Sequence, residues 1–350
     1  MKVTRRDFIK NTLMAGGTLL FSPGPLKSAL PHAADPEPAY AALEKQGQLA
    51  ERIAKVYGIL KNCRLCPRAC GVDRLSGEIG FCRAPQQVMV YAAQPHFGEE
   101  ISLTGLSGSG TIFFSHCNLR CIFCQNWSIS HLGHGKMITD EELADLMIFL
   151  QDIGCHNINL VTPTHVMPHI LNATRHACRR GLEIPLVYNT SGYERAEIVK
   201  LLDGIVDIYL PDLKYMDPVH ADKYSAGASD YPETAKQAIL EMHRQVGPHQ
   251  VDQRGIAVRG LMIRHLVMPN RIAGTRRFVE WVAEFLPSHT YINIMAQYHV
   301  AYEAFEYPEI ARGITVQEFL EAMSWAEASG LRNLDPRSIQ LRDYYRKTSS

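Results

Sequence analysis

The chain has 350 residues, of which 46% are hydrophobic and 21% are charged. These values are close to those of an average soluble globular protein, and they exclude a disordered, collagen-like or coiled-coil chain. Lysine plus arginine and aspartate plus glutamate are equal at 36 each, so no excess charge attracts nucleic acid or anionic lipid. We therefore expect no nucleic-acid partner, and the length suits one large α/β domain or two ordinary ones.

The first residues have the features of a targeting segment. Basic residues precede an apolar run at 12–21, which is too short to span a bilayer. Arg5 and Arg6, followed two positions later by Phe8, resemble the twin-arginine export motif. We expect residues 1–34 to be a leader that directs the chain to the periplasm or tethers it to the membrane without a transmembrane span. The alternative is an uncleaved N-terminal helix on a cytoplasmic protein.

Residues 35–104 are expected to form an N-terminal segment of their own. The stretch from Tyr40 to Leu60 has apolar residues at helical spacing. Four thiolates, which can complete the shell of one zinc ion or of a second iron–sulfur cluster, follow in a short glycine-rich stretch: Cys63, Cys66, Cys70 and Cys82. Spacing alone does not separate these two metals. Without metal, the four could form two disulfides in an exported protein or stay reduced in a cytosolic one.

Strand-like and helix-like segments alternate through the rest of the chain. Six short apolar segments rich in β-branched residues are predicted to be strands: 111–115, 157–162, 184–189, 205–210, 257–266 and 291–296. Capping boxes at Thr139 and Thr315 mark the starts of two of the helices. Apolar strands that alternate with helices indicate a parallel sheet covered by helices. We predict an α/β fold, a partial (β/α)6 barrel over 105–305, with a helical extension over 306–350.

The most informative stretch follows the first predicted strand. Cys117, Cys121 and Cys124 lie at spacings of four and three, with no fourth cysteine nearby. Three thiolates cannot ligate all four irons of a [4Fe-4S] cluster, so one iron would stay open to a cofactor or substrate. A zinc site would need a fourth ligand, for which His116 or His131 could serve.

This Cys-x3-Cys-x2-Cys spacing, with Phe123 directly before the last cysteine, resembles the signature of the radical S-adenosylmethionine (radical SAM) superfamily. More narrowly, Cys124-Gln-Asn126, the strand end at 188–192 and Asp212-Leu-Lys214 look like the branch that contains pyruvate formate-lyase activating enzyme and its uncharacterised relatives. The resemblance covers residues 60–335. It implies a barrel of the radical SAM type and an oxidoreductase that binds a [4Fe-4S] cluster and S-adenosylmethionine. Such an enzyme cleaves S-adenosylmethionine reductively and abstracts hydrogen with the 5′-deoxyadenosyl radical.

The resemblance also implies cofactor contacts at the carboxyl ends of the strands, where barrels place their catalytic groups. Phe123 would lie beside the adenine, unless it only packs the loop. Thr162 stands where relatives have a Gly-Gly-Glu stretch, and its hydroxyl could accept from the cofactor ammonium. Other groups are expected at the methionine, ribose and carboxylate: Asn189, Ser191, Asp212, Lys214 and Arg264. The alternative for these groups is a buried polar network satisfied by its own neighbours.

His165 and His265 are the catalytic candidates on the substrate side. Glu99 and Glu100 precede the first predicted strand, and we expect them to be structural or to lie at the rim. The implied partners are an electron donor such as a flavodoxin or ferredoxin, and a protein or small-molecule substrate. Activation of a glycyl-radical enzyme is one such reaction. Radical modification of another peptide or small molecule and a non-catalytic iron–sulfur or zinc protein are the alternatives.

Overall fold

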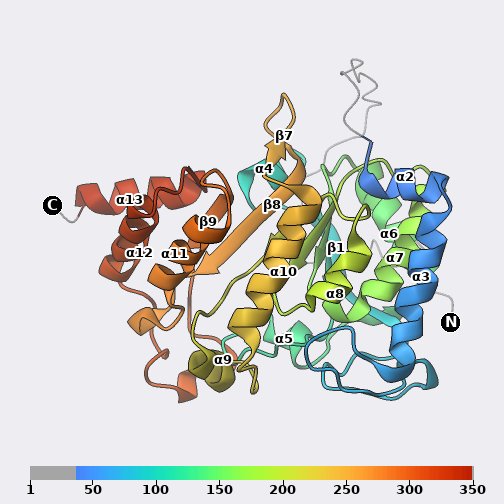
Figure 1. Cartoon of the computed structure of the whole chain (residues 1–350), viewed down its shortest axis with the longest axis horizontal. Coiled ribbons are helices and arrows are strands. Elements are labelled where there is room, and N and C mark those ends of the chain that lie inside the picture. The colour runs from blue at the N-terminus through green and yellow to red at the C-terminus, as the bar shows by residue number, and fades with distance from the viewer. Residues whose placement is uncertain (1–36, 349–350) are drawn as a thin grey trace, which may run out of the picture. The chain divides into compact units, whose positions relative to one another are not determined.

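The structure is a computed structural model that describes residues 37–348 (Figure 1). The predicted leader at 1–34 lies outside these residues, so export stays a prediction. Among the described helices, none is both long enough and apolar enough to cross a membrane.

Six parallel strands form the centre of the sheet and follow one another in chain order. They are β2 (Ser109–Phe114), β4 (Ile158–Val161), β5 (Leu186–Thr190), β6 (Ile208–Pro211), β8 (Ala257–Leu266) and β9 (Tyr291–Met295). Each overlaps one of the six predicted strands, so the predicted α/β class is confirmed. The strand order β10-β9-β8-β6-β5-β4-β2-β1-β3 has two ends, as an open, partial barrel requires.

Four further strands at the margins of the sheet were not predicted from the sequence. They are β1 (Val88–His96), β3 (Lys136–Ile138), β7 (Gln250–Val251) and β10 (Asn333–Leu334). β1 pairs antiparallel with β2 and β3, and its partly exposed residues include Pro95, which suits an edge strand. β10 pairs with β9, so the expected helical extension also carries a strand. Two or three residues are too few to show a strand period.

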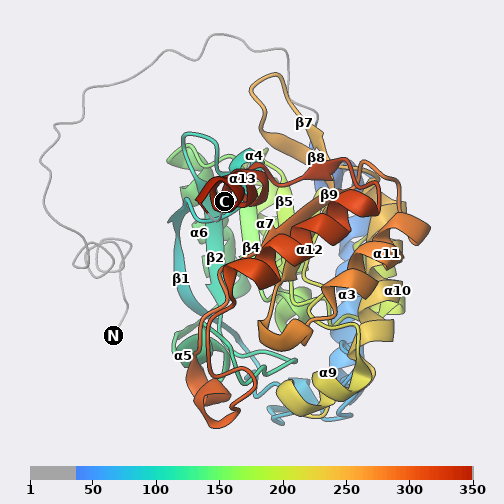
Figure 2. The same cartoon turned by 90° about the vertical axis from the view of Figure 1, so that its left-hand side faces the viewer.

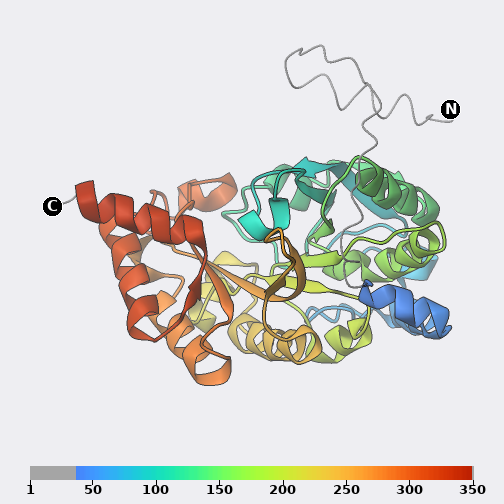
Figure 3. The same ribbon diagram turned by 90° about the horizontal axis from the view of Figure 1, so that it is seen from above.

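Helices cover the outer face of the strands, and the C-terminal helices lie beyond one edge (Figure 3). In chain order they are α2 (Ala39–Lys45), α3 (Gln48–Ile59), α4 (Ile101–Thr104), α5 (Trp127–Ser130), α6 (Asp140–Asp152), α7 (Met167–Cys178), α8 (Ala196–Val199), α9 (Pro218–Tyr224), α10 (Tyr231–Val246), α11 (Thr275–Phe285), α12 (Val316–Ala328) and α13 (Pro336–Thr348). Both predicted capping boxes are present, at Thr139 before α6 and at Thr315 before α12. Gly47, in the left-handed region at φ 74°, divides the predicted N-terminal helix into α2 and α3.

Inside the barrel, an apolar layer lies at the amino ends of the strands and a polar layer lies nearer their carboxyl ends. The apolar layer consists of Leu103 from α4 and inward-facing strand residues: Val187, Ile208, Leu210, Ala257, Met262 and Tyr291. Because side chains alternate along a strand, the residues two positions further on also face inward. On β5, β8 and β9 these are Asn189, Arg264 and Asn293. The interior is therefore apolar towards the amino ends of the strands and polar towards their carboxyl ends.

Candidate active site

The loop after β2 carries Cys117, Cys121 and Cys124. The backbone N–H of Leu119 donates to Cys117 Sγ over 3.4 Å, and the Ser225 hydroxyl donates to Cys121 Sγ over 3.3 Å. The Ser130 hydroxyl lies 3.1 Å from Cys124 Sγ. Each sulfur thus has a group that can donate a hydrogen bond within reach, which favours the charged thiolate that an iron–sulfur cluster requires.

The same loop has an unusual backbone. His116 and Arg120, at φ 73° and 56°, occupy the left-handed region that non-glycine residues seldom adopt. Such conformations persist where the surrounding structure holds them, and they concentrate at functional sites. Here the Arg68 guanidinium donates to the carbonyl oxygens of Asn118, over 3.0 Å, and Leu119, over 3.3 Å. The loop is therefore fixed from outside by the N-terminal segment.

The three thiols fit a cluster better than a single ion. They are close enough to interact electrostatically. Yet within residues 37–348 no three Cys, His, Asp or Glu side chains converge enough to hold one metal ion. A zinc ion would bring its thiolates to within about 4 Å of one another, whereas a [4Fe-4S] cluster spreads them over separate corners. His131 is also not poised as a zinc ligand through Nε2, which lies 3.0 Å from the Cys121 carbonyl oxygen.

Burial governs the protonation of these cysteines. It raises the pKa of Cys121 to about 12, against the opposing influence of the nearby Lys214 ammonium. Burial likewise raises the pKa of Cys117. Without metal both groups are neutral thiols at pH 7, so loading a cluster must release protons.

The polar layer of the barrel forms one connected network around Arg264. Its Nε donates to Asp212 Oδ1 over 2.8 Å, its Nη1 to Glu99 Oε2 over 3.1 Å and its Nη2 to Asn189 Oδ1 over 2.5 Å. The Lys214 ammonium donates to the other Asp212 oxygen over 2.6 Å. The structure thus brings together four of the predicted site residues. Each guanidinium nitrogen already serves a protein partner, so contact of Arg264 with a cofactor carboxylate stays a prediction.

Charge pairing keeps this network ionised. Burial by itself would raise the pKa of Asp212, but Arg264 and Lys214 outweigh it and hold that pKa below its usual value. Burial would lower the pKa of Lys214, but Asp212 and the Cys121 sulfur raise it above its usual value. Lys214 therefore brings a positive charge to the cysteine loop.

Glu99 and Glu100 were expected to be structural or at the rim, and the structure places both in the interior. They precede α4, which crosses the amino ends of the strands, and their side chains are buried. Glu99 pairs with Arg264, and Glu100 Oε1 accepts from Asn293 Nδ2 over 2.8 Å. Burial raises the pKa of Glu100, whose Oε2 has no partner. They close the polar layer on the side of the amino ends of the strands. Their role is therefore structural, and they lie inside the barrel and not at its rim.

Three predicted residues at the strand ends take no part in the hydrogen bonds around Arg264. Thr162, directly after β4, has a left-handed φ of 60°. The Ser191 hydroxyl is buried and has no hydrogen-bond partner. His165 Nε2 lies 2.7 Å from the Ser115 carbonyl oxygen, so this nitrogen carries the proton and the buried, unpartnered Nδ1 is a bare acceptor. Burial lowers the pKa of His165 to about 3, so the ring is neutral.

The predicted catalytic role of His265 is not supported by its position. Nδ1 lies 2.6 Å from the Leu213 carbonyl oxygen and Nε2 lies 2.9 Å from the Thr275 hydroxyl. The ring is fully buried and stacks on Phe278 of α11 at 4.2 Å between centroids. Arg264 points into the barrel, so the next residue on the strand must point outward. His265 therefore fastens β8 to α11.

Phe123 is buried between two tyrosines. Its ring centroid lies 6.1 Å from that of Tyr215 and 5.9 Å from that of Tyr298. These contacts fix the ring beside Cys124. A role at the adenine stays a prediction.

Glu194, which the sequence analysis did not single out, lies fully buried near the strand ends. The hydroxyls of Thr164 and Thr190 each donate to its Oε1 over 2.5 Å. Burial is the largest influence and raises the pKa of Glu194 to about 7. A lone glutamate after an apolar strand gave no periodic signal by which to find it.

Glu194→Gln should change how stability depends on pH. The native carboxyl has a pKa near 7 rather than 4.5, so the folded state binds more protons than the unfolded state between these values. Wild-type stability therefore falls as pH rises through this window, by up to about 3 kcal/mol from this group. We expect the variant, compared with wild type by urea unfolding at pH 5 and pH 8, to lack that loss. Equal pH slopes would contradict the assignment.

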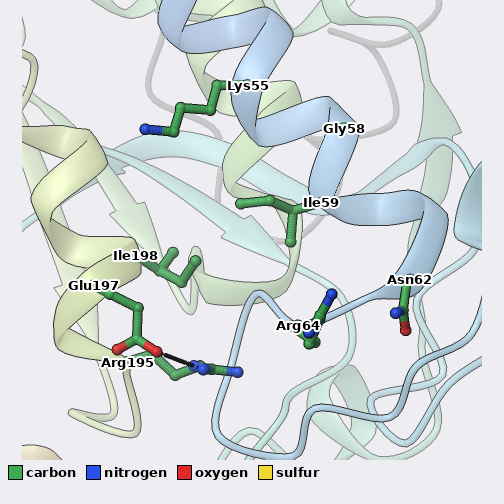
Figure 4. Close-up of a pocket in the computed structure, with 8 residues that line it drawn as sticks. All are labelled: Lys55, Gly58, Ile59, Asn62, Arg64, Arg195, Glu197 and Ile198. Carbon is green, nitrogen blue, oxygen red and sulfur yellow. Dashed lines mark hydrogen bonds and ion pairs between the residues drawn. The ribbon is translucent and has the colours of Figure 1, made fainter.

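A surface pocket lies between α3 and α8 (Figure 4). Its lining includes Lys55, Arg64 and Arg195, the last of which forms an ion pair with Glu197. None of the predicted cofactor residues lines it. Two of its lining residues, Arg64 and Arg195, directly follow Cys63 and Glu194 in the chain.

Comparisons with known proteins agree with the cysteine loop. A sequence model of the radical SAM superfamily matches residues 111–248, which include Cys117, Cys121 and Cys124. Uncharacterized protein MJ0674 of Methanocaldococcus jannaschii is 33% identical over 294 residues, covering 81% of this chain and 79% of that protein. Uncharacterized protein MJ0808 of the same organism is 24% identical over 292 residues, covering 74% and 79% respectively.

Two solved structures are similar at low identity. TYW1 with a lysine-pyruvate adduct bound has a TM-score of 0.40 and 12% identity, covering 62% of this chain and 73% of that one. Methylornithine synthase (PylB) has a TM-score of 0.39 and 13% identity, covering 65% and 71%. The family match and the relative that shares a third of its residues over four-fifths of the chain establish what the three-cysteine loop indicates: the chain belongs to the radical SAM superfamily.

Proposed function

We propose that this chain is an enzyme that removes a hydrogen atom from a substrate, using S-adenosylmethionine at a [4Fe-4S] cluster on Cys117, Cys121 and Cys124. When bound, the cluster and S-adenosylmethionine supply a reductive cleavage that yields a 5′-deoxyadenosyl radical. The observation that carries the proposal is the set of three thiols, each with a hydrogen-bond donor, on the loop after β2. Membership of the superfamily supports the same chemistry.

The protein supplies position, charge and exclusion of water. Cys117 and Cys121 are buried, so a reactive species formed beside them is shielded from solvent. Lys214 brings positive charge towards the anionic thiolates. The free Ser191 hydroxyl and the bare His165 Nδ1 can meet a polar cofactor or substrate at the strand ends.

For the substrate, we propose a glycine of a glycyl-radical enzyme. The supporting features are Cys124-Gln-Asn126 and Asp212-Leu-Lys214, which resemble the branch that contains pyruvate formate-lyase activating enzyme. A one-electron carrier such as a flavodoxin or ferredoxin would supply the electron.

The test is S-adenosylmethionine cleavage by the anaerobically purified full chain. With dithionite as reductant we expect 5′-deoxyadenosine and methionine in equal amounts, measured by liquid chromatography and mass spectrometry. Absence of both from protein with a full complement of iron would exclude the enzyme in favour of a non-catalytic iron–sulfur protein. Pyruvate formate-lyase is the probe for the substrate class, since a glycyl radical gives a doublet in electron paramagnetic resonance. Cleavage without that doublet would favour another peptide or a small molecule.

A further inference from the structure

The N-terminal segment holds its four cysteines together at the same end of the barrel as the cysteine loop. All four are free thiols, and Cys63, Cys66 and Cys82 are buried. Cys63 interacts electrostatically with Cys70 and Cys82, and Cys66 interacts with Cys82 and Cys63. The loops that carry them lie at the lower end of the molecule, where α5 also lies (Figures 1 and 2). The four thiols therefore form one group without disulfides.

This group has the same backbone support as the cysteine loop of the barrel. Burial is the largest influence on Cys63, Cys66 and Cys82 and raises the pKa of each, and the backbone N–H two residues further on, that of Leu65, Arg68 and Ala84 respectively, acts against it. Leu119 N–H stands at the same spacing from Cys117 and donates to its sulfur. A backbone N–H beside a sulfur favours the thiolate that a metal requires, so these three cysteines have support of the same kind as Cys117.

Cys70 is held by a close approach of the chain. An ideal Cβ on Gly80 would lie only 2.5 Å from Cys70 Sγ, so any side chain at position 80 would displace the sulfur. Glycine at this position lets the stretch before Cys82 fold directly against Cys70.

The four thiols are spread too widely for one ion. In the part of the chain that the structure describes, no three ligand side chains converge as a single metal ion requires. The same holds for the three thiols of the barrel loop. A [4Fe-4S] cluster takes its thiolates on separate irons and does not require them to converge on one point, whereas a single zinc ion does.

The two groups are direct neighbours. Arg68, between Cys66 and Cys70, donates to the carbonyl oxygens of Asn118 and Leu119, which follow Cys117. Cys82 interacts electrostatically with Cys117. The N-terminal cysteines are thus fastened to the loop that begins the catalytic set.

We propose that Cys63, Cys66, Cys70 and Cys82 hold a second [4Fe-4S] cluster beside the first. Four protein thiolates leave no iron open, so this cluster does not bind S-adenosylmethionine. The inference goes beyond the proposed function, because the two sites have separate ligands and are tested separately.

Metal content of the full chain, isolated anaerobically, tests the proposal without a variant. We expect about eight irons and about eight sulfides per chain, with no zinc, as two [4Fe-4S] clusters require. About four irons, with or without one zinc, would overturn the second cluster.

Two variants assign the clusters to their ligands. Cys66→Ser/Cys82→Ser should keep about four irons, and the paramagnetic signal of its reduced cluster should shift on addition of S-adenosylmethionine. Cys117→Ala/Cys121→Ala/Cys124→Ala should also keep about four irons, with a signal that S-adenosylmethionine leaves unchanged. Cys178→Ser is the matched control and should lose no iron. If the second variant is free of iron although it is folded by circular dichroism, the N-terminal site is refuted. If it keeps all the iron of wild type, the proposed function fails instead.

Discussion

Replacing Cys121 by alanine is expected to lower the production of 5′-deoxyadenosine to background, a loss of more than about a thousandfold. The sulfur is buried, and the Ser225 hydroxyl donates to it over 3.3 Å. No other described thiol accompanies Cys117 and Cys124 on this loop, so two ligands would remain for the cluster. Product formation over one hour with dithionite and S-adenosylmethionine measures the loss.

Cys178→Ala is the matched control for that variant. Cys178 ends α7 and is half-buried, so its replacement removes a thiol of similar chemistry away from the loop. It should keep its iron and its product formation. A Cys121→Ala protein that retained both the SAM-responsive signal and the product would contradict the three-thiolate assignment.

The centre of the sheet could be predicted because each central strand is a short apolar run between turn signals. That pattern depends only on the strand's own burial. Strand β1 escaped because only three of its nine residues are buried and it includes Pro95. The cysteine loop could be predicted because its ligands lie within eight residues of one another along the chain.

Partners far apart in the sequence could not be predicted in the same way. Arg264 and Glu99 are separated by 165 positions, and nothing local to either residue indicates the pair. Glu99 reaches the interior only because α4 crosses the amino ends of the strands. The fastening of Asn118 by Arg68 is of the same kind, since it depends on how the N-terminal segment packs on the barrel.

The position of His265 outside the barrel interior has a simpler cause. Arg264 and His265 are adjacent on β8, and adjacent residues of a strand face opposite sides of the sheet. Only one of the two could point into the barrel. The inward positions of β5 and β6 carry Asn189 and, just beyond the strand, Asp212, which match a guanidinium. Because Arg264 faces the interior of the barrel, strand alternation places the His265 side chain on the outer face of the sheet.

Arg264→Met is expected to lower the free energy of unfolding by about 3–5 kcal/mol. The variant removes the partner that the Asp212 and Glu99 carboxylates share, and their side chains are only 12% and 10% exposed. Asp212 keeps its ion pair with Lys214, so Glu99 is the carboxylate left unpaired. Unpaired buried carboxylates are favoured only when protonated, so the loss should be smaller at pH 5 than at pH 8. Urea unfolding without cofactor at the two pH values measures both effects.

Arg276→Met provides the contrast, because that side chain is 70% exposed and pairs with Glu280 one helical turn away on α11. An exposed pair of this kind contributes less than about 0.5 kcal/mol, so the control should unfold as wild type does. Adding Glu99→Gln to Arg264→Met should restore part of the lost stability, since Glu99 has its ion pair with Arg264, whereas Asp212 keeps Lys214. Arg264→Met could instead be as stable as wild type and only weaken the response to S-adenosylmethionine. That result would make Arg264 a ligand for the cofactor carboxylate. It would also mean that the ion pairs of Arg264 do not stabilise the fold.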